Sequence, residues 1–329
     1  MHRLAGSTAR DLRLHLVPLS GGAEAQRVLR VTARYRNSQA RLCSRAAVVK
    51  VLRGRPAREA EIYRTFVARS VPGLAPRFLS APRLVDGRVL LFVEAVRRRE
   101  AWPWRRPSAL TVSARALGRF HATAASGAVV PSGWNYEDEL HGSARATVEA
   151  LGRCRNDPDL ADLVRQSRPA ARLVDALPRL RGQILGENAG PLGRRIIHGD
   201  VHSGNAMIVQ RGGLDRLLLL DWGRARLGSP LEDVSSWLQT LRPWEPRAMA
   251  MHDTLLTGYL EEAGISSGLT SNLRSAYWIA GASNALAGAL RWHLDDARSR
   301  PIGSPARNAA VAGARNWVRV LRRAHAWTM

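Results

Sequence analysis

The first third of the chain alternates apolar and polar positions in the manner of β-strands. Two such runs cover 12–16 and 28–31, and the stretch between them contains Ser20, Gly21 and Gly22. Alternation with a period of two is typical of a strand with one buried face, and a glycine turn between two such runs predicts a β-hairpin. These glycines could let backbone N–H groups approach phosphates, but an ordinary hairpin turn explains them equally well.

Longer apolar runs at 45–52 and 88–95 predict two further strands. Between them, apolar residues at helical spacing predict a helix over 58–69, and three prolines predict a loop over 71–83. The N-terminal part is therefore expected to be mostly strand, with one main helix.

Helical periodicity predominates later in the chain. A helix is predicted over 110–121, and a second hairpin over 206–220, where two β-type runs flank Gly212 and Gly213. Four helical patterns follow this hairpin, over 232–241, 247–263, 269–298 and 306–325. We therefore expect the C-terminal part to be mostly helical.

The residues that flank the second hairpin carry candidate chemistry. His198-Gly199-Asp200 follows a short apolar run, Asn205 lies five residues after Asp200, and the hairpin returns Asp221 to the end where Asn205 lies. Two carboxylates and one amide oxygen suit Mg²⁺, which prefers oxygen ligands. One carboxylate, Asp200, is then left to accept a proton, which completes a minimal set for phosphoryl transfer. Either short motif alone is an ordinary turn, but their order and spacing are far more specific.

A charged pair is predicted in the N-terminal part. Glu59 shares a helix face with Ile62, Tyr63 and Phe66, so its carboxylate is expected to be buried. A buried carboxylate without a cationic partner is costly, and Lys50 in the preceding strand is the natural partner. Lys50 is the single lysine beside 49 arginines, which indicates a place where a compact ammonium is needed and a planar guanidinium would not fit.

The composition is strongly basic but does not indicate a particular partner. The chain has 329 residues, 45% of them hydrophobic, and a net charge of +23 from 50 basic and 27 acidic residues. Such a charge raises nucleic acid or an acidic membrane surface as partner. The arginines are scattered, however, and the densest run, 97–106 with Trp102 and Trp104, is more simply a solvated loop.

The cysteines and the apolar runs of the sequence indicate where in the cell the protein is expected. Cys43 and Cys154 lie far apart and form no metal-binding pattern, so neither a disulfide framework nor a zinc site is expected. No leader-like apolar run and no window long enough to span a bilayer is present in the sequence. A cytoplasmic protein without membrane contact is therefore expected.

Three motifs in order give the chain its resemblance to a known family. H-G-D-x-H-x-x-N at 198–205, D-W-G at 221–223 and G-x-P-x-x-D at 228–233 resemble the aminoglycoside phosphotransferase and choline kinase-like family. The resemblance implies an α+β, bilobal protein-kinase-like fold. Its N-terminal lobe, 1–93, would be a small antiparallel sheet with one main helix, and its C-terminal lobe, 94–329, would be large and mostly helical.

The resemblance also implies roles for these residues. Asp200 would be the catalytic base and Asn205 and Asp221 the Mg²⁺ ligands, with His198 and Asp233 supporting the loop. A first-turn carboxylate favoured by the helix dipole is a plainer explanation of Asp233, and both can hold. His121, near the end of its predicted helix, would be a packed structural residue.

By the same resemblance the N-terminal lobe binds ATP. Lys50, held by Glu59, would contact the nucleotide phosphates, and the turn at Ser20, Gly21 and Gly22 would cover them. The backbone of Val93 and Ala95, at the hinge between lobes, would hold adenine.

The expected function is ATP·Mg²⁺-dependent transfer of the γ-phosphate to a hydroxyl of a small molecule. The acceptor could be an antibiotic, which would give resistance by modification, or an ordinary metabolite of the sugar, amino alcohol or nucleoside type. A polycationic aminoglycoside needs an acidic pocket, and a strongly basic surface repels it at long range. The candidate acidic residues are Glu137, Asp138, Glu139, Glu261, Glu262, Asp295 and Asp296.

Three rival functions are weaker. A nucleotide-binding pseudokinase would lack part of the motif set, which is intact here. A protein kinase would need a longer segment after Asp221 and usually an arginine in place of Gly199. A nucleic-acid-binding protein would rest on charge alone, without a recognised motif.

Overall fold

The computed structural model describes residues 10–19, 25–123, 134–186 and 192–327. In this part the chain forms two compact units, one made of residues up to 101 together with 205–225, and the other of 102–204 and 226 onwards. The first unit combines the N-terminal part with a later hairpin. The lobe boundary that we placed near Glu94 from chain order stays a prediction.

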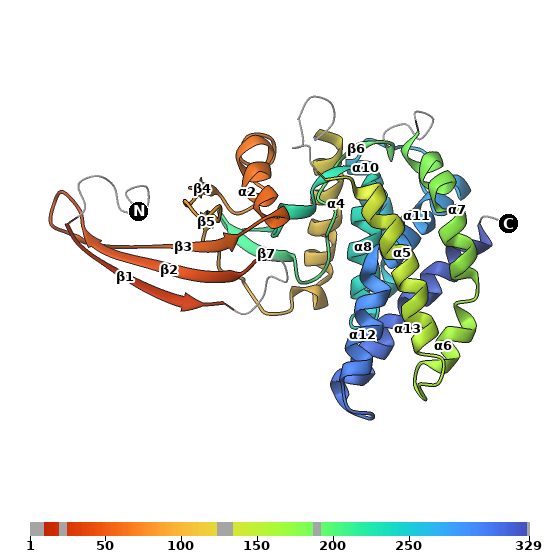
Figure 1. The fold of residues 1–329 in the computed structure, drawn as a ribbon. Coiled ribbons are helices and arrows are strands. Elements are labelled where there is room, and N and C mark those ends of the chain that lie inside the picture. Colours follow the sequence, from red (N-terminus) through yellow and green to blue (C-terminus); the bar gives the residue numbers. More distant parts are fainter. Residues whose placement is uncertain (1–9, 20–24, 124–133, 187–191, 328–329) are drawn as a thin grey trace. The chain divides into compact units, whose positions relative to one another are not determined.

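The first unit is built on an antiparallel sheet of five strands in the order β1-β2-β3-β5-β4 (Figure 1). Strands β1 and β2 form the predicted hairpin, and β3 lies between β2 and β5, so that Lys50 pairs with Val28 on one side and Leu91 on the other. The strands are β1 (Arg10–Pro18), β2 (Arg27–Arg36), β3 (Leu42–Leu52), β4 (Phe78–Ser80) and β5 (Val89–Glu94).

Strand β4 corrects the prediction of a loop over 71–83. It is only three residues long, and its register against β5 shifts between Phe78 and Ser80. Prolines on both sides hide so short an edge strand from any periodicity, since an edge position tolerates prolines that a central strand would not.

The predicted helix over 58–69 is present as α2 (Arg58–Ile62), a π-helical turn (Tyr63–Val67) and α3 (Ala68–Ser70). Its buried face contains Glu59 with Ile62, Tyr63 and Phe66, whereas Glu61 is exposed, as the spacing predicted. The π turn is a local widening of the helix that side-chain periodicity does not reveal.

The second hairpin, β7 (Ala206–Arg211) and β8 (Leu214–Leu219), also belongs to the first unit. Gly212 and Gly213 form its two-residue turn with φ of 58° and 78°, the left-handed conformations that the tight turn requires. Inside, Met207, Val209 and Leu218 form a buried apolar cluster. The cluster packs the two strands together, and Asn205 and Asp221 flank them at one end of the hairpin.

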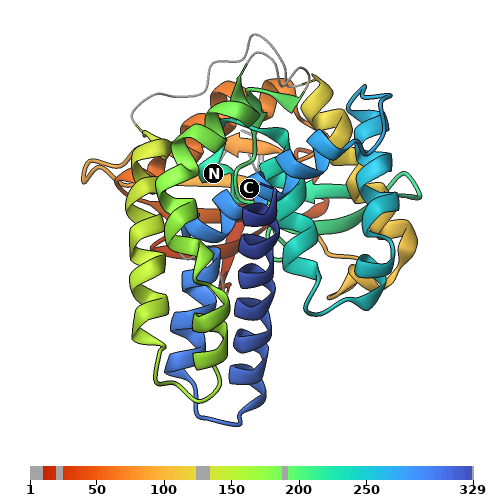
Figure 2. The same ribbon diagram turned by 90° about the vertical axis from the view of Figure 1, so that its right-hand side faces the viewer.

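The second unit is mostly helical, and α5, α12 and α13 run side by side in it (Figure 2). Two short strands, β6 (Arg195–Ile197) and β9 (Arg226–Gly228), pair antiparallel next to the motif at 198–205. The helices are α4 (Pro107–Thr123), α5 (Tyr136–Arg153), α6 (Ala161–Gln166), α7 (Pro169–Leu185), α8 (Pro230–Leu241), α9 (Pro246–Ala250), α10 (His252–Glu262), α11 (Ser271–Asn284), α12 (Leu290–Ser299) and α13 (Pro305–Ala326).

Two predicted helices are each interrupted. The helix predicted over 247–263 ends at Ala250 and restarts at His252, and the one predicted over 269–298 is broken by a π-helical turn, Ala285–Ala289. Gly288 in that turn has φ of 134°, a conformation that only glycine adopts readily. Helices α5 to α7 were not predicted, because the acidic residues and prolines of this region obscure its helical periodicity.

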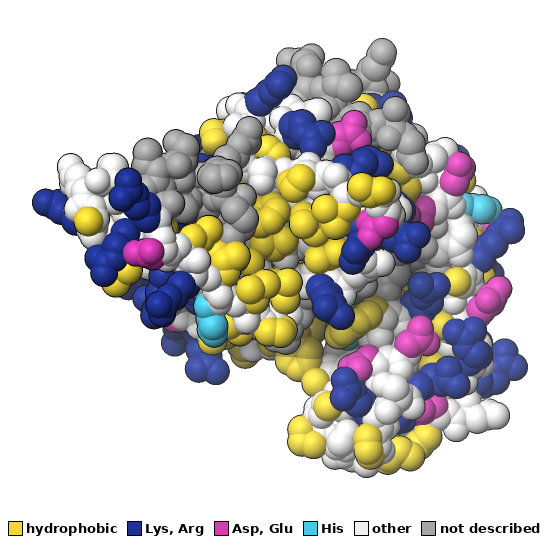
Figure 3. All heavy atoms as spheres, turned by 60° about the vertical axis from the view of Figure 1, so that its left-hand side comes forward, with side chains coloured by type: hydrophobic (Ala, Val, Ile, Leu, Met, Phe, Trp, Pro, Cys, Tyr) yellow, Lys and Arg dark blue, Asp and Glu magenta, His cyan; other side chains and the backbone are white. Residues whose placement is uncertain are grey.

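Charged and apolar side chains on the surface bear on possible partners. On the face drawn in Figure 3 the basic side chains are spread among acidic and apolar ones, without a single basic tract. Trp104 is buried against Trp237 in the second unit, with ring centroids 6.0 Å apart, so the tryptophans of 97–106 do not form one exposed patch. No helix among the described residues is both long and apolar enough to cross a membrane.

Candidate active site

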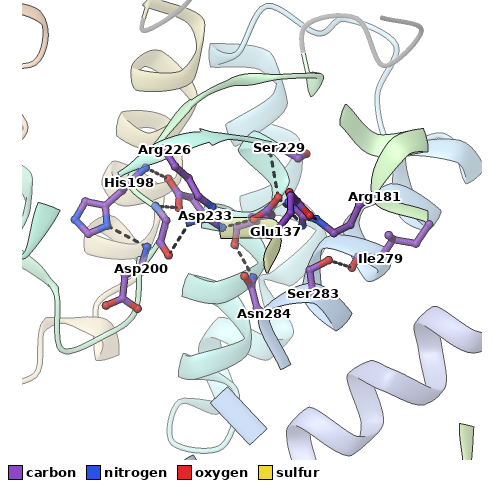
Figure 4. Close-up of polar contacts among 12 residues, drawn as sticks. Glu137, Arg181, His198, Asp200, Arg226, Ser229, Asp233, Ile279, Ser283 and Asn284 are labelled. Carbon is purple, nitrogen blue, oxygen red and sulfur yellow. Dashed lines mark hydrogen bonds and ion pairs between the residues drawn. The ribbon is translucent and has the colours of Figure 1, made fainter. Parts of the chain in front are cut away.

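The motif that begins at His198 lies in a loop that Asp233 holds by its backbone (Figure 4). The carboxylate of Asp233, in the first turn of α8, accepts hydrogen bonds from the backbone N–H groups of His198 at 2.7 Å and Gly199 at 2.8 Å. Both His198 and Asp233 are fully buried. Gly199 has φ of 78°, so the chain turns sharply between the residue that is braced and Asp200.

Asp200 projects away from this buried cluster in Figure 4. Its backbone N–H donates to Nδ1 of His198 at 3.3 Å, and its side chain is 39% exposed, close to that of His202 at 3.9 Å. A carboxylate with a fixed backbone and an accessible side chain can accept a proton from a bound hydroxyl.

His121 supports Asp233 from the other side. Its Nε2 lies 3.1 Å from the Asp233 carboxylate and its Nδ1 lies 3.0 Å from the hydroxyl of Tyr259. Burial alone would raise the pKa of Asp233, but the hydrogen bond from His121 and the N–H groups of the loop outweigh it and lower that pKa. Asp233 therefore stays ionised at neutral pH and keeps its hydrogen bonds to the loop.

A buried ion-pair network, which the sequence did not reveal, lies behind the loop. Arg226 of β9 donates to the carbonyl of Gly199 at 3.2 Å, pairs with Glu232 and lies over the ring of Tyr136, 3.5 Å from its centroid. Glu232 also pairs with Arg181 of α7 at 3.0 Å. The chain has 49 arginines, and the sequence does not show which of them are buried, so Arg226 and Arg181 were not singled out.

In the first unit Lys50 lies between two carboxylates. Its ammonium is 2.8 Å from Glu59 and 3.3 Å from Asp221. Burial would lower the pKa of Lys50, but these carboxylates outweigh it and raise that pKa, so the ammonium stays charged. Burial raises the pKa of Glu59 to about 7 against the opposing effect of Lys50.

Asn205 and Asp221 lie at the same end of the second hairpin. The backbone N–H of Leu220, the residue before Asp221, donates to the carbonyl of Asn205 at 2.7 Å. Asp221 itself is left-handed, with φ of 62° and ψ of 68°, one of three such non-glycine residues in the described part. Strained backbone of this kind is typical of functional sites.

These two residues offer one carboxylate and one amide oxygen, which are the donor types that a hard divalent cation prefers. The Asp221 carboxylate lies beside the ammonium of Lys50. The described residues contain no cluster of three or more His, Cys, Asp and Glu side chains, so an all-protein metal cage is not present among them. Mg²⁺ characteristically leaves several coordination positions to water and phosphate, and a two-residue set is enough for it.

Arg58 is a further residue that the sequence did not reveal. It precedes Glu59 on α2, and its guanidinium donates to the carbonyls of Gly223 at 2.9 Å and Ala225 at 2.8 Å. The helix that positions the partner of Lys50 is thereby tied to the turn that follows Asp221.

The structure describes only some of the other residues that we expect to contact the nucleotide. Ser20, Gly21 and Gly22 lie outside the described residues. Val93 pairs with Val48 and Phe78 near the end of β5, and Ala95 follows that strand directly. Their role at the adenine stays a prediction.

Comparison with known proteins agrees with this architecture. The chain matches the model of the phosphotransferase enzyme family over residues 15–268. None of the curated protein sequences compared with the chain is significantly similar to it.

Several solved structures share the fold. An aminoglycoside phosphotransferase from Alicyclobacillus acidocaldarius superposes with a TM-score of 0.58 at 15% identity, covering 98% of this chain and 92% of that one. A spectinomycin phosphotransferase in complex with ADP and spectinomycin gives 0.57 at 14% identity, covering 97% and 95%. A choline kinase from Cryptosporidium parvum gives 0.58 at 10% identity, covering 94% and 88%.

At such identities the likeness to these structures establishes the kinase-like fold, while the family model spans most of the chain. The chain belongs to the phosphotransferase enzyme family.

Proposed function

We propose that the protein transfers the γ-phosphate of ATP, with Mg²⁺, to a hydroxyl of a neutral or anionic small molecule. The observation that carries the proposal is the arrangement at Asp221. Its carboxylate occupies a strained left-handed position 3.3 Å from the buried ammonium of Lys50, and the adjacent backbone is bonded to Asn205.

In this proposal the first unit holds the nucleotide. Lys50 binds its phosphates, and Glu59 positions that ammonium. Arg58 connects α2 to the turn after Asp221. Asn205 and Asp221 would hold Mg²⁺, which would supply neutralisation of the charge on the transferring phosphoryl group. The solved structure of the spectinomycin phosphotransferase contains ADP, which supports a nucleotide in this fold.

The second unit supplies the base. Asp200 orients the acceptor hydroxyl and takes its proton, and its position is fixed by the bonds of Asp233 to His198 and Gly199. Positioning and charge neutralisation account for most of the catalysis of phosphoryl transfer.

The acidic side chains support an acceptor that is not polycationic. Four of the seven candidates for an acidic pocket lie within 4.0 Å of an arginine: Glu137 of Arg181, Glu262 of Arg119, Asp295 of Arg153 and Asp296 of Arg300. Two more accept hydrogen bonds from neighbours, Asp138 from Asn135 and Glu139 from Trp134. These carboxylates are committed to local partners and are distributed over several helices.

An antibiotic and an ordinary metabolite can each be neutral or anionic, so the proposal covers both. A nucleotide-binding pseudokinase is the second candidate, and only turnover separates it from an active enzyme.

The test is Mg²⁺-dependent ADP release by the purified protein with a panel of cationic, neutral and anionic hydroxyl compounds, each paired with its deoxy analogue. The proposal expects stimulation by a neutral or anionic compound, its loss with the deoxy analogue and with EDTA, and a phosphate ester by mass spectrometry. Strongest stimulation by polycations would contradict the acceptor class. ATP binding without stimulation by any compound would favour the pseudokinase.

A further inference from the structure

Within the second unit, the C-terminal end of α8 meets a fixed polar framework centred on Gln239. The buried amide of Gln239 donates to the hydroxyl of Tyr277 at 2.7 Å and accepts from Arg319 of α13 at 2.6 Å. Its backbone carbonyl accepts from Asn316 at 2.8 Å. Arg319 is thereby held in one orientation by neutral oxygens.

Arg242 and Arg323 add positive charge around Arg319. Arg242 follows directly after α8, while Arg319 and Arg323, four residues apart, share one face of α13. Among the described residues none of the three has a carboxylate within ion-pair distance. Burial, together with Arg242 and Arg323, lowers the pKa of Arg319 to about 10, and burial and Arg323 also lower the pKa of Arg242.

Neighbouring groups leave the positive charge uncompensated. Asp253 of α10 is bound at 3.0 Å by another arginine, Arg274, and at 2.9 Å by His252. Burial lowers the pKa of His252, so its imidazole is neutral at pH 7. Asp253, which His252 links to the framework through Tyr277, is therefore already paired with a fourth arginine.

An aromatic wall completes the site. Arg319 lies over the ring of Trp278, 5.2 Å from its centroid, and the imidazole of His252 stacks on the same ring with centroids 6.3 Å apart. His252 also bonds the hydroxyl of Tyr277 at 3.0 Å. Arg242 and Arg319 are half-buried and Arg323 is exposed, so the cluster is open to solvent on one side.

We propose that Arg242, Arg319 and Arg323 bind a small phosphate-type oxyanion at a site separate from the catalytic loop. Asp233 and Arg242 are nine residues apart along α8, which corresponds to about 14 Å at the rise of an α-helix. Like charges held together by neutral partners are unfavourable until an anion arrives, and guanidinium forks match the oxygens of phosphate.

The experiment is calorimetric titration of inorganic pyrophosphate into the full-length protein in EDTA. Wild type binds it, and Lys50→Met, which removes the proposed nucleotide-phosphate contact, retains binding that depends on Arg319. Arg319→Gln and Arg323→Gln weaken binding roughly tenfold or more, because each removes a charge-assisted hydrogen bond. Arg322→Gln is the matched control, since it makes the same change on the same helix but faces Gln166 of α6, and it keeps wild-type affinity.

A second readout separates binding from folding. Without ligand, Arg323→Gln should melt at a temperature equal to or above that of wild type, because it relieves repulsion among the arginines. Pyrophosphate should then raise the melting temperature of wild type more than that of the variant.

Three results would overturn the proposal: no binding of pyrophosphate by wild type, equal weakening in Arg322→Gln and Arg319→Gln, or loss of binding in Lys50→Met. Binding of a single-stranded oligonucleotide that depends on Arg319 while pyrophosphate does not bind would assign the cluster to nucleic acid instead.

Discussion

At the scale of single residues, the candidate site depends on side chains held in unfavourable surroundings. Lys50 and Glu59 are buried charges that stabilise each other at 2.8 Å, and Asp221 adopts a left-handed backbone. The single lysine was detectable in the sequence because all other basic residues are arginines. The conformation of Asp221 was not, since a dihedral angle is set by the turn as a whole.

Asp221→Asn should abolish the Mg²⁺-dependent part of ATP binding. Asparagine tolerates the left-handed conformation, so the change removes the charge and leaves the turn intact. Calorimetry should give the variant the same ATP affinity with Mg²⁺ as with EDTA, whereas wild type binds more tightly with Mg²⁺.

Asp215→Asn is the matched control, because Asp215 lies on β8 of the same hairpin and pairs with Arg99 at 2.6 Å. It should retain the response to Mg²⁺. A response to Mg²⁺ in Asp221→Asn equal to that of wild type would remove Asp221 from the metal site.

At the scale of elements, the loop that carries Asp200 is supported by the packing of α4, α8 and α10. His121 of α4 connects Asp233 of α8 with Tyr259 of α10, so these helices must approach closely. Gly118 permits this approach. A Cβ there would lie 2.8 Å from Cβ of Glu262 and still closer to the carbonyl oxygen of Tyr259.

Gly118→Ala should therefore destabilise the fold by about 1–3 kcal/mol, because the obstacle is backbone that cannot move aside. Chemical denaturation measures the change. Gly142→Ala on α5 is the control, since a Cβ there meets nothing within 4 Å and alanine favours a helix. Equal stability of Gly118→Ala and wild type would refute the close packing of α4 and α10.

The elements also show how far a sequence predicts a structure of this kind. The two hairpins, the strand of Lys50 and the helix of Glu59 follow from periodicity and glycine turns, and the structure contains all of them. Strand β4 and the π turns were missed because they depend on neighbours across the sheet or helix. The supports supplied by Arg58 and Arg226 were missed because their partners are carbonyls distant in the sequence.

At the scale of the whole molecule, stability should depend on pH through His293 of α12. Burial lowers the pKa of its imidazole to about 4, and among the described residues its Nδ1 has no hydrogen-bond partner. An unfolded histidine has a pKa near 6.5. Below that pH the histidine of the unfolded chain is protonated, whereas His293 of the folded protein stays neutral down to about pH 4.

The contribution of His293 to the free energy of unfolding should therefore fall by up to about 3 kcal/mol between about pH 6.5 and pH 4. Glu59, whose pKa is raised, contributes in the opposite direction. Urea denaturation at several pH values measures the difference in slope between variants. His293→Leu should remove the contribution of His293 from the wild-type slope, and His141→Leu, which removes an exposed imidazole on α5, should keep the wild-type slope. An unchanged slope in His293→Leu would contradict the assignment.

The central claim is that Asp200 is the base of a phosphotransferase, and the most direct test is to compare Asp200→Asn with wild type on the best acceptor of the panel. The variant should lose kcat by at least about a hundredfold, the usual contribution of a positioned base, with ATP affinity nearly unchanged. Asp162→Asn, the same change at an exposed carboxylate of α6, should behave as wild type. A kcat of Asp200→Asn equal to that of wild type would contradict the claim.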